Sequence, residues 1–255
     1  MHMVRPKKHL GQHFLHDRNI AAKIVNCLGT EHENVCEIGP GTGVLTGLLL
    51  QREDIRSLTL IEVDEESCDY LRNHFRDERL TLLQADFLKT DLQSHINGPF
   101  ALIGNFPYNI SSQIFFRVID LRNTVPEVVC MIQREVADRI AAPPGSKTYG
   151  ILSVLLQAWY DIHYEFTVSE QVFTPPPRVK SAVIRMRRNT TARLSCDEQL
   201  FRTIVKAAFN QRRKTLRNAL RHLLPGDGRS IPFADQRAEQ LSVAQFEELT
   251  RAIGT

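Results

Sequence analysis

The chain alternates short apolar runs with stretches of helical periodicity, and this alternation restricts its fold more than any other feature. The strand-like runs lie at residues 34–38, 57–63, 80–84, 100–103, 127–132, 161–168 and 181–187. Helical patterns separate most of them, for example at 111–121 and 148–159. Such alternation predicts a mainly parallel sheet covered by helices on both faces. Only a proline-rich loop at 175–177 separates the last two runs, which predicts an antiparallel pair at one edge.

A glycine-rich turn follows the first strand-like run. It contains Gly39, Gly41 and Gly43, and an apolar helix start follows it. Glycine permits positive φ and lets a ligand approach the backbone closely. The pattern is typical of a nucleotide-binding βα turn. The third glycine falls one position too early for the dinucleotide fingerprint, so pyrophosphate binding is less favoured. A plain loop is the alternative.

Polar residues follow three successive strand-like runs. Glu62 lies about 20 residues beyond the glycines, where an acid can bind two ribose hydroxyls, and Asp86 and Asn105 follow the next two runs. Ligands of open α/β sheets bind outside the carboxyl ends of the strands. An isolated Asp at such a place is usually a cap or turn residue. Three polar residues beside a glycine turn instead predict a site on one edge of the sheet.

The sequence Gly-Asn-Phe-Pro-Tyr at 104–108 suits the binding of a flat base with an exocyclic amine. The Asn105 side-chain oxygen can accept a hydrogen bond from the amine. Pro107 stiffens the loop, and Tyr108 offers a face for stacking. A tight turn after a strand is the alternative interpretation, since these residue types form turns.

These motifs resemble those of the S-adenosylmethionine-dependent adenosine N6-dimethyltransferases that act on ribosomal RNA, most closely the small-subunit form. The resemblance covers nearly the whole chain. The motifs that carry it lie at residues 8–15, 37–43, 61–64, 84–87, 104–111, 173–183 and 209–218. One departure is His13, where many relatives carry Asn.

The resemblance implies a Rossmann-like class I methyltransferase sheet, mostly parallel with seven strands and one of them antiparallel, and a small all-helical C-terminal domain. The catalytic domain is expected at 1–190 and the RNA-binding domain at 191–255. The residues expected to bind S-adenosylmethionine are His13, Leu15, Gly39, Gly41, Glu62, Val63, Asp86, Phe87 and Asn105. Asn105, Pro107 and Tyr108 are expected to hold the target base, and Phe14 and Leu15 to close over the cofactor.

Charge distribution predicts where RNA binds. The net charge is only +3, but acids are missing from a basic stretch in the C-terminal part and scarce near the N-terminus. Arg213, Arg217 and Arg221 are predicted to share one helical face. A run without acids favours phosphate binding over an ordinary solvated surface. The predicted RNA-binding residues are Arg5, Lys7, Lys8, Arg212, Arg213, Lys214, Arg217 and Arg221.

Other features indicate a cytoplasmic protein. Five scattered cysteines without a Cys-x-x-Cys pair are typical of reduced thiols, and no Cys/His spacing suggests a metal site. No apolar run is long enough to span a membrane, and the N-terminus lacks a signal core. No spare apolar helix face indicates a dimer, so a monomer is expected.

The predicted function is transfer of methyl groups to N6 of two adjacent adenosines, in a hairpin near the 3′ end of small-subunit rRNA, during assembly of the pre-ribosomal small subunit. The alternatives are a large-subunit rRNA adenine N6-methyltransferase of the antibiotic-resistance type and a noncatalytic ribosome assembly factor. A DNA adenine methyltransferase would need a sequence-reading domain, for which the helical tail is too small. A dinucleotide-dependent oxidoreductase would leave the Asn-Phe-Pro-Tyr motif unexplained.

Overall fold

The computed structural model describes residues 4–224 and 231–254. The sequence Pro-Gly-Asp-Gly at 225–228, which predicts a turn, lies outside the described residues. Contacts group the chain into two units. The first contains the residues up to 137 and 162–188, and the second contains 138–161 and the residues from 189 onward. The predicted boundary at 190 places segment 138–161 in the catalytic domain, whereas its contacts place it with the C-terminal helices. The division of functions at residue 190 stays a prediction.

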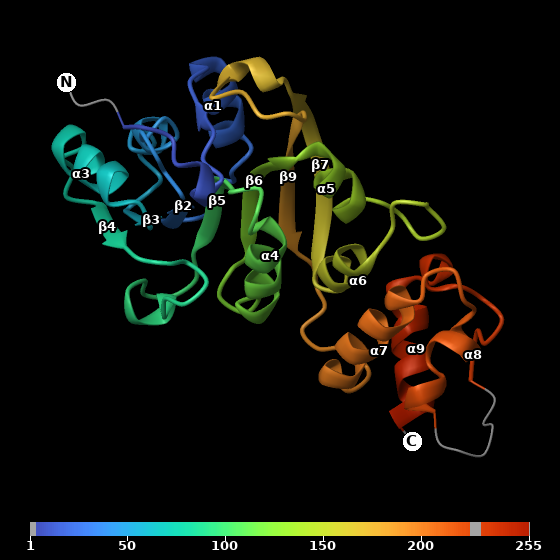
Figure 1. The fold of residues 1–255 in the computed structure, drawn as a ribbon. Helices are drawn as coiled ribbons and strands as arrows, with labels where there is room; N and C mark the ends of the chain where they lie inside the picture. The colour runs from blue at the N-terminus through green and yellow to red at the C-terminus, as the bar shows by residue number, and fades with distance from the viewer. Residues whose placement is uncertain (1–3, 225–230, 255) are drawn as a thin grey trace. The chain divides into compact units, whose positions relative to one another are not determined.

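The first unit is built on a seven-stranded sheet with the order β4-β3-β2-β5-β6-β9-β7 (Figure 1). Its strands are β2 (Asn34–Ile38), β3 (Ser57–Glu62), β4 (Leu80–Gln84), β5 (Ala101–Asn105), β6 (Glu127–Gln133), β7 (Tyr160–Val168) and β9 (Ser181–Arg188). The pairs β2–β3, β2–β5, β3–β4 and β5–β6 are parallel, and β6–β9 is antiparallel. The predicted fold class is confirmed, because every expected strand forms within two residues of its predicted bounds.

Apolar side chains on both sides of this sheet are buried beneath helices. The helices of this region are α1 (Arg18–Asn26), α2 (Thr46–Leu49), α3 (Glu65–His74), α4 (Ser111–Asp120) and α5 (Arg134–Ile140). One core cluster joins α1, α2 and α3 to alternate residues of the central strands, including Leu60, Ile103 and Met131. The intervening strand residues are buried as well, and α4 crosses the sheet on that side (Figure 1). No helix in the described part of the chain is long and apolar enough to cross a membrane.

A two-stranded sheet lies outside the main one and was not predicted. β1 (Phe14–Leu15) pairs antiparallel with β8 (Phe173–Thr174). Strands of two residues have no periodicity by which a sequence could reveal them. This pairing ties the N-terminal segment to the chain that leads into β9.

The second unit is helical, with α6 (Ile151–Gln157), α7 (Glu198–Asn210), α8 (Leu216–Ala219) and α9 (Val243–Gly254). Short 3-10 helices, η4 (Arg221–Leu223) and η5 (Ala238–Gln240), complete it. A chain of aromatic contacts in its core links the residues on either side of α6 to α7 and α9, and the rings involved belong to Tyr149, Trp159, Phe201, Phe209 and Phe246.

The single basic helical face predicted for Arg213, Arg217 and Arg221 is wrong. α7 ends at Asn210, and Thr215 has the extended conformation of a residue that precedes a new helix (φ −66°, ψ 157°). Leu216, Ala219 and Leu220 are fully buried, so α8 is oriented by its own apolar face. The basic residues therefore lie on a turn and on two short helices instead of on one straight helix.

Glu127 anchors a buried ion-pair network at the amino end of β6. Its side chain is 1% exposed and accepts hydrogen bonds from Arg185 Nε at 2.7 Å, Arg187 Nε at 3.2 Å and the Gly29 amide at 3.2 Å, and it lies 2.8 Å from His32 Nε2. Glu31, His32 and Glu127 have the spacing of a metal site. The two guanidinium groups already supply the compensating positive charge, so the group is explained as an ion-pair network.

Replacing Glu127 by Gln is expected to lower the free energy of unfolding by about 3 kcal/mol at pH 7, because it removes the buried carboxylate with which the partly exposed Arg185 and Arg187 pair. Burial alone would raise the pKa of Glu127, but the hydrogen bonds from His32 and Arg185 outweigh it and lower the pKa from 4.5 to about 2. A depressed carboxyl pKa gives stability that is present above pH 4.5 and is lost as the pH falls toward 2. Urea unfolding at pH 7 and pH 2.5 should therefore show a difference that shrinks in acid.

Glu33→Gln provides the matched control, because Glu33 pairs with Arg56 on the surface. Exposed pairs contribute little, so this variant should unfold like the wild type. An Glu127→Gln deficit that is equally large at both pH values would contradict the proposed role of the carboxylate charge.

Candidate active site

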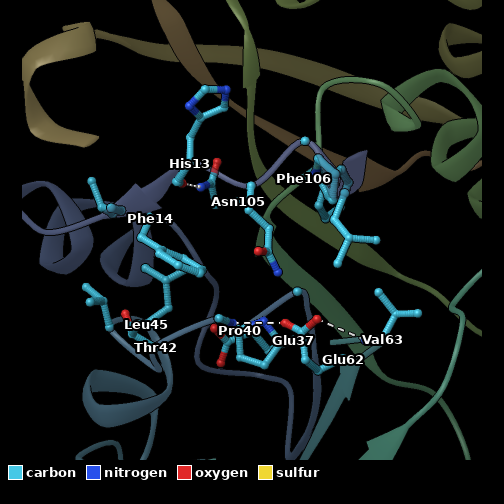
Figure 2. A pocket seen from close by; sticks show the side chains of 18 of the residues that line it. His13, Phe14, Glu37, Pro40, Thr42, Leu45, Glu62, Val63, Asn105 and Phe106 are labelled. Atoms are coloured by element: carbon cyan, nitrogen blue, oxygen red, sulfur yellow. Dashed lines mark hydrogen bonds between the residues drawn. The ribbon is translucent and has the colours of Figure 1, made fainter. Parts of the chain in front are cut away.

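A pocket opens at the carboxyl ends of β2, β3 and β5, where the sequence places its polar residues (Figure 2). Four segments line it: residues 10–15, the glycine turn with its flanks, the end of β3, and the loop after β5. The lining residues predicted as site residues are His13, Leu15, Gly39, Gly41, Glu62, Val63, Asn105, Pro107 and Tyr108. The pocket thus brings together predicted residues that lie up to 95 positions apart in the sequence, from His13 to Tyr108.

Two glycines allow close backbone approach beside the pocket. Gly41 has φ +57°, and a Cβ at this position would lie 2.8 Å from the ring of Phe14. A Cβ at Gly104 would lie 2.5 Å from the Ile38 carbonyl oxygen, so only glycine lets β5 pass β2 at this point. The glycines therefore shape both the turn and the sheet on which it rests.

Glu62 holds the glycine turn against the end of β3. Its Oε2 accepts a hydrogen bond from the Gly41 amide at 3.1 Å, and its Oε1 accepts from the amides of Val63 and Asp64, each at 2.9 Å. Glu62 is 4% exposed. Burial raises its pKa, against the opposing effect of these amide donors. A carboxylate offers about four acceptor positions, so Glu62 retains capacity for a hydroxyl donor within the pocket.

Glu37 is a second acid of the pocket wall, and the sequence-based prediction missed it. It lies in β2, is 1% exposed, and accepts a hydrogen bond from Thr46 Oγ1 at 2.7 Å. Burial raises its pKa to about 8. The signal that could have identified it is a glutamate inside an otherwise apolar strand. A buried acid needs hydrogen-bond partners, and such groups are common at functional sites.

Asn105 presents an acceptor without a partner. Its Nδ2 donates to the His13 carbonyl oxygen at 2.9 Å, as Figure 2 shows, and this bond fixes the side-chain amide. Its Oδ1 is buried and has no hydrogen-bond partner among the described residues. Buried polar atoms are nearly always paired, so an unpaired acceptor on a pocket wall indicates a place for a ligand donor.

Tyr108, in the loop after Asn105, and His13 form the aromatic mouth of the pocket. Tyr108 Oη lies 2.5 Å from Ser181 Oγ, and its ring stacks on His13 with the ring centroids 5.5 Å apart. The His13 ring points away from Glu62 in Figure 2, and its Nδ1 lies 2.8 Å from the Pro175 carbonyl oxygen. His13 therefore faces the loop before β9, while its backbone carbonyl orients Asn105.

A polar clasp holds the N-terminal segment across the pocket. Asp64 is buried and accepts hydrogen bonds from Lys7 Nζ, from Ser67 Oγ at 2.8 Å and from Gln12 Nε2 at 3.4 Å. Burial raises the pKa of Asp64, but these donors reverse the effect and lower it below its ordinary value. Lys7, predicted to bind RNA, is thus engaged with Asp64 in this structure.

Two predicted cofactor residues do not line the pocket. Asp86 instead organises the turn after β4, where its Oδ1 accepts from the Leu88 amide at 2.9 Å, and Phe87 is 4% exposed. Val63, in contrast, lines the pocket and leaves 53% of its surface exposed. Binding of the cofactor by Asp86 and Phe87 stays a prediction.

The remaining residues predicted to bind RNA are distributed over both units. Arg5 and Lys8 are exposed in the first unit. In the second, Arg213, Lys214, Arg217 and Arg221 are exposed, Arg217 pairs with Asp235 at 3.1 Å, and Arg212 donates to the Lys147 carbonyl oxygen. Most of these side chains are accessible to a polyanion.

Comparison with known proteins places the whole chain in one family. The family described as ribosomal RNA adenine dimethylase matches residues 3–253. A protein of Parabacteroides distasonis named ribosomal RNA small subunit methyltransferase A is 56% identical over 98% of this chain and 94% of its own length. A protein of the same name from Cytophaga hutchinsonii is 52% identical over 99% of both chains.

Solved structures agree with the fold. A dimethyladenosine transferase from Plasmodium falciparum superimposes with a TM-score of 0.74 at 22% identity, covering 93% of this chain and 96% of that chain. The 23S rRNA methyltransferase ErmE gives a TM-score of 0.66 at 24% identity, covering 95% of this chain and 100% of the other. At these identities the likeness establishes the fold alone.

Proposed function

The chain belongs to the ribosomal RNA adenine dimethylase family, and from this membership we propose that it dimethylates N6 of two adjacent adenosines in a hairpin near the 3′ end of small-subunit rRNA, with S-adenosylmethionine as methyl donor. The observation that carries the proposal is the buried, unpaired Oδ1 of Asn105 on the pocket wall. An adenine N6 amine is a donor that this acceptor fits.

The lining of the pocket fits S-adenosylmethionine. Glu62 has acceptor capacity for ribose hydroxyls, Val63 offers an exposed apolar surface for a base, and the glycine turn lets a ligand approach the backbone. When bound, S-adenosylmethionine supplies an electrophilic methyl group, so the protein need not activate it.

Orientation of the target amine is the main task of the protein. The adenine amine is a poor nucleophile because its lone pair conjugates with the ring. Asn105 Oδ1, together with a backbone carbonyl of the loop at 106–107, would accept its hydrogens and direct the lone pair into the pocket. Tyr108 would contact the extruded base, and its bond to Ser181 limits its motion. Alignment of this kind contributes about 7–11 kcal/mol in well-positioned reactions.

The proposed partner is the small ribosomal subunit during its assembly, in the cytoplasm, with the enzyme acting as a monomer free of membranes. The names of the relatives support the small-subunit target. The accessible basic residues of both units support phosphate contacts, which should weaken steeply with salt. Cofactor contacts from Asp86 and Phe87, and a separate RNA-binding role for residues 191–255, belong to the same proposal.

A direct test offers labelled S-adenosylmethionine with three substrates in parallel. These are small subunits that lack N6,N6-dimethyladenosine, bare large-subunit rRNA and adenine-rich DNA, and the products are identified by mass spectrometry. Dimethyladenosine in small-subunit RNA alone is the expected result. Label in large-subunit RNA would favour the resistance-type enzyme. Binding to small subunits without any label would favour a noncatalytic assembly factor.

A further inference from the structure

The loop between β8 and β9 carries an exposed apolar side chain between two exposed cations. Val179 is 47% exposed, and Arg178 and Lys180 flank it. The other large hydrophobic side chains that are exposed in the described residues have a local explanation: Val63 lines the pocket, and Tyr164 bonds Thr167 on β7. Neither Arg178 nor Lys180 forms an ion pair with any described residue. The mechanism above uses none of the three.

The position of this loop relates it to the active site. β9 begins at Ser181, which pairs with Gln133 at the carboxyl end of β6, while Asn105 pairs with Met131 on the same strand. The loop therefore lies at the edge of the sheet where the pocket opens.

Two hydrogen bonds join the loop to the mouth of the pocket. Ser181, directly after Lys180, contacts the Tyr108 hydroxyl at 2.5 Å. Pro175, at the other end of the loop, contacts the His13 ring at 2.8 Å. Both contacts reach residues that form the aromatic mouth, so residues 178–180 are held beside the place where the target base would enter.

We propose that Arg178, Val179 and Lys180 form the contact surface for the nucleotides that flank the extruded adenosine. The inference rests on the proposed function. Extraction of a base from a stack exposes the faces of its neighbours, and proteins that distort nucleic acids cover such faces with apolar side chains. Val179 covers the exposed base face, and the cations on either side bind the adjacent phosphates.

The charge pattern favours RNA over an acidic protein as the occupant. Two cations separated by one residue match the repeating charge of a nucleic acid backbone, and an apolar group between them matches a base face. An acidic protein that paired with the two cations would place its charged side chains beside the apolar Val179, which is unfavourable. Contact with a ribosomal protein is therefore an outcome that the test must distinguish.

The test compares an Arg178→Gln/Lys180→Gln double variant and Val179→Ser with the wild type. Binding of S-adenosylhomocysteine should be unchanged in both, because neither change touches the pocket wall. The double variant should raise KM for small subunits about tenfold and reduce the salt slope of binding by about 1.5, as expected for two lost phosphate contacts. Val179→Ser should lower kcat/KM about fivefold.

An Arg56→Gln/Arg76→Gln double variant and Tyr164→Ser are the matched controls, because they remove two exposed positive charges and one exposed apolar side chain away from the loop. Variants of the loop that behave like these controls would overturn the inference. A photo-crosslinking amino acid at position 179 gives a readout that does not require activity. Crosslinks to rRNA beside the methylated adenosines are expected, and crosslinks to a ribosomal protein would overturn the inference.

The proposed function and this inference fail in different ways. Wild-type protein that methylates no small-subunit RNA would refute the proposed function. Wild-type protein that methylates normally, with loop variants equal to their controls, would refute the role of the loop alone.

Discussion

Asn105→Ala is expected to lower kcat for methyl transfer by about 100- to 1000-fold, the cost of removing one preorganised polar contact to a reacting group. The Oδ1 atom is buried and unpaired, and its amide is already fixed by the bond from Nδ2 to the His13 carbonyl oxygen. The side chain therefore holds an acceptor in place before the substrate arrives. Binding of S-adenosylhomocysteine should fall at most a few fold, and calorimetry would measure it beside single-turnover methylation.

The same substitution also releases the N-terminal segment from β5, which could affect activity indirectly. Lys7→Met is the control, because it loosens the same segment at the Asp64 clasp without touching Asn105. If Lys7→Met reproduced the loss in single-turnover rate, the segment and not the acceptor would explain the effect of Asn105→Ala. Normal methylation by Asn105→Ala would contradict the mechanism.

The sheet could be predicted because each central strand is buried on both sides. Runs such as Val128–Ile132 and Ala101–Ile103 are apolar throughout, as fully buried parallel strands must be. The conformation of the basic C-terminal stretch was harder to predict. Charges at helical spacing between Arg213 and Arg221 do not determine whether the backbone is helical, whereas burial of Leu216 and Leu220 does, and burial depends on tertiary contacts.

The site residues that could be predicted are those whose positions are determined by the end of a strand. Glu62 and Asn105 follow their strands directly, and both line the pocket. Asp86 also follows its strand, yet its carboxylate caps the next turn, because a short acidic side chain can bond its own backbone as readily as a ligand. The Lys7–Asp64 clasp was unpredictable in principle, since it joins residues 57 positions apart without any shared motif.

Glu62→Ala is expected to weaken S-adenosylhomocysteine binding by about 100-fold, which corresponds to about 2.7 kcal/mol. The carboxylate accepts three backbone amides and connects the Gly41 turn to the end of β3. Its loss removes a proposed partner of the ribose hydroxyls and leaves the amides of Gly41 and Asp64 without an acceptor. Each hydrogen bond from a ribose hydroxyl to the charged carboxylate contributes about 1.5–3 kcal/mol to binding, so loss of one or two such bonds suffices for the predicted change.

Glu62→Gln separates charge from shape. The amide oxygen of Gln can still accept from one part of the backbone, but its NH₂ group would face an amide donor or the ligand hydroxyls, so an intermediate affinity is expected. Asp86→Ala is the informative comparison, because Asp86 follows the next strand but lies outside the pocket wall. Equal losses of affinity in Glu62→Ala and Asp86→Ala would show that the bound state recruits Asp86 through a rearranged turn. Unchanged affinity in Glu62→Ala would remove Glu62 from the cofactor site, and the exposed Val63 beside it would lose its explanation as a base contact.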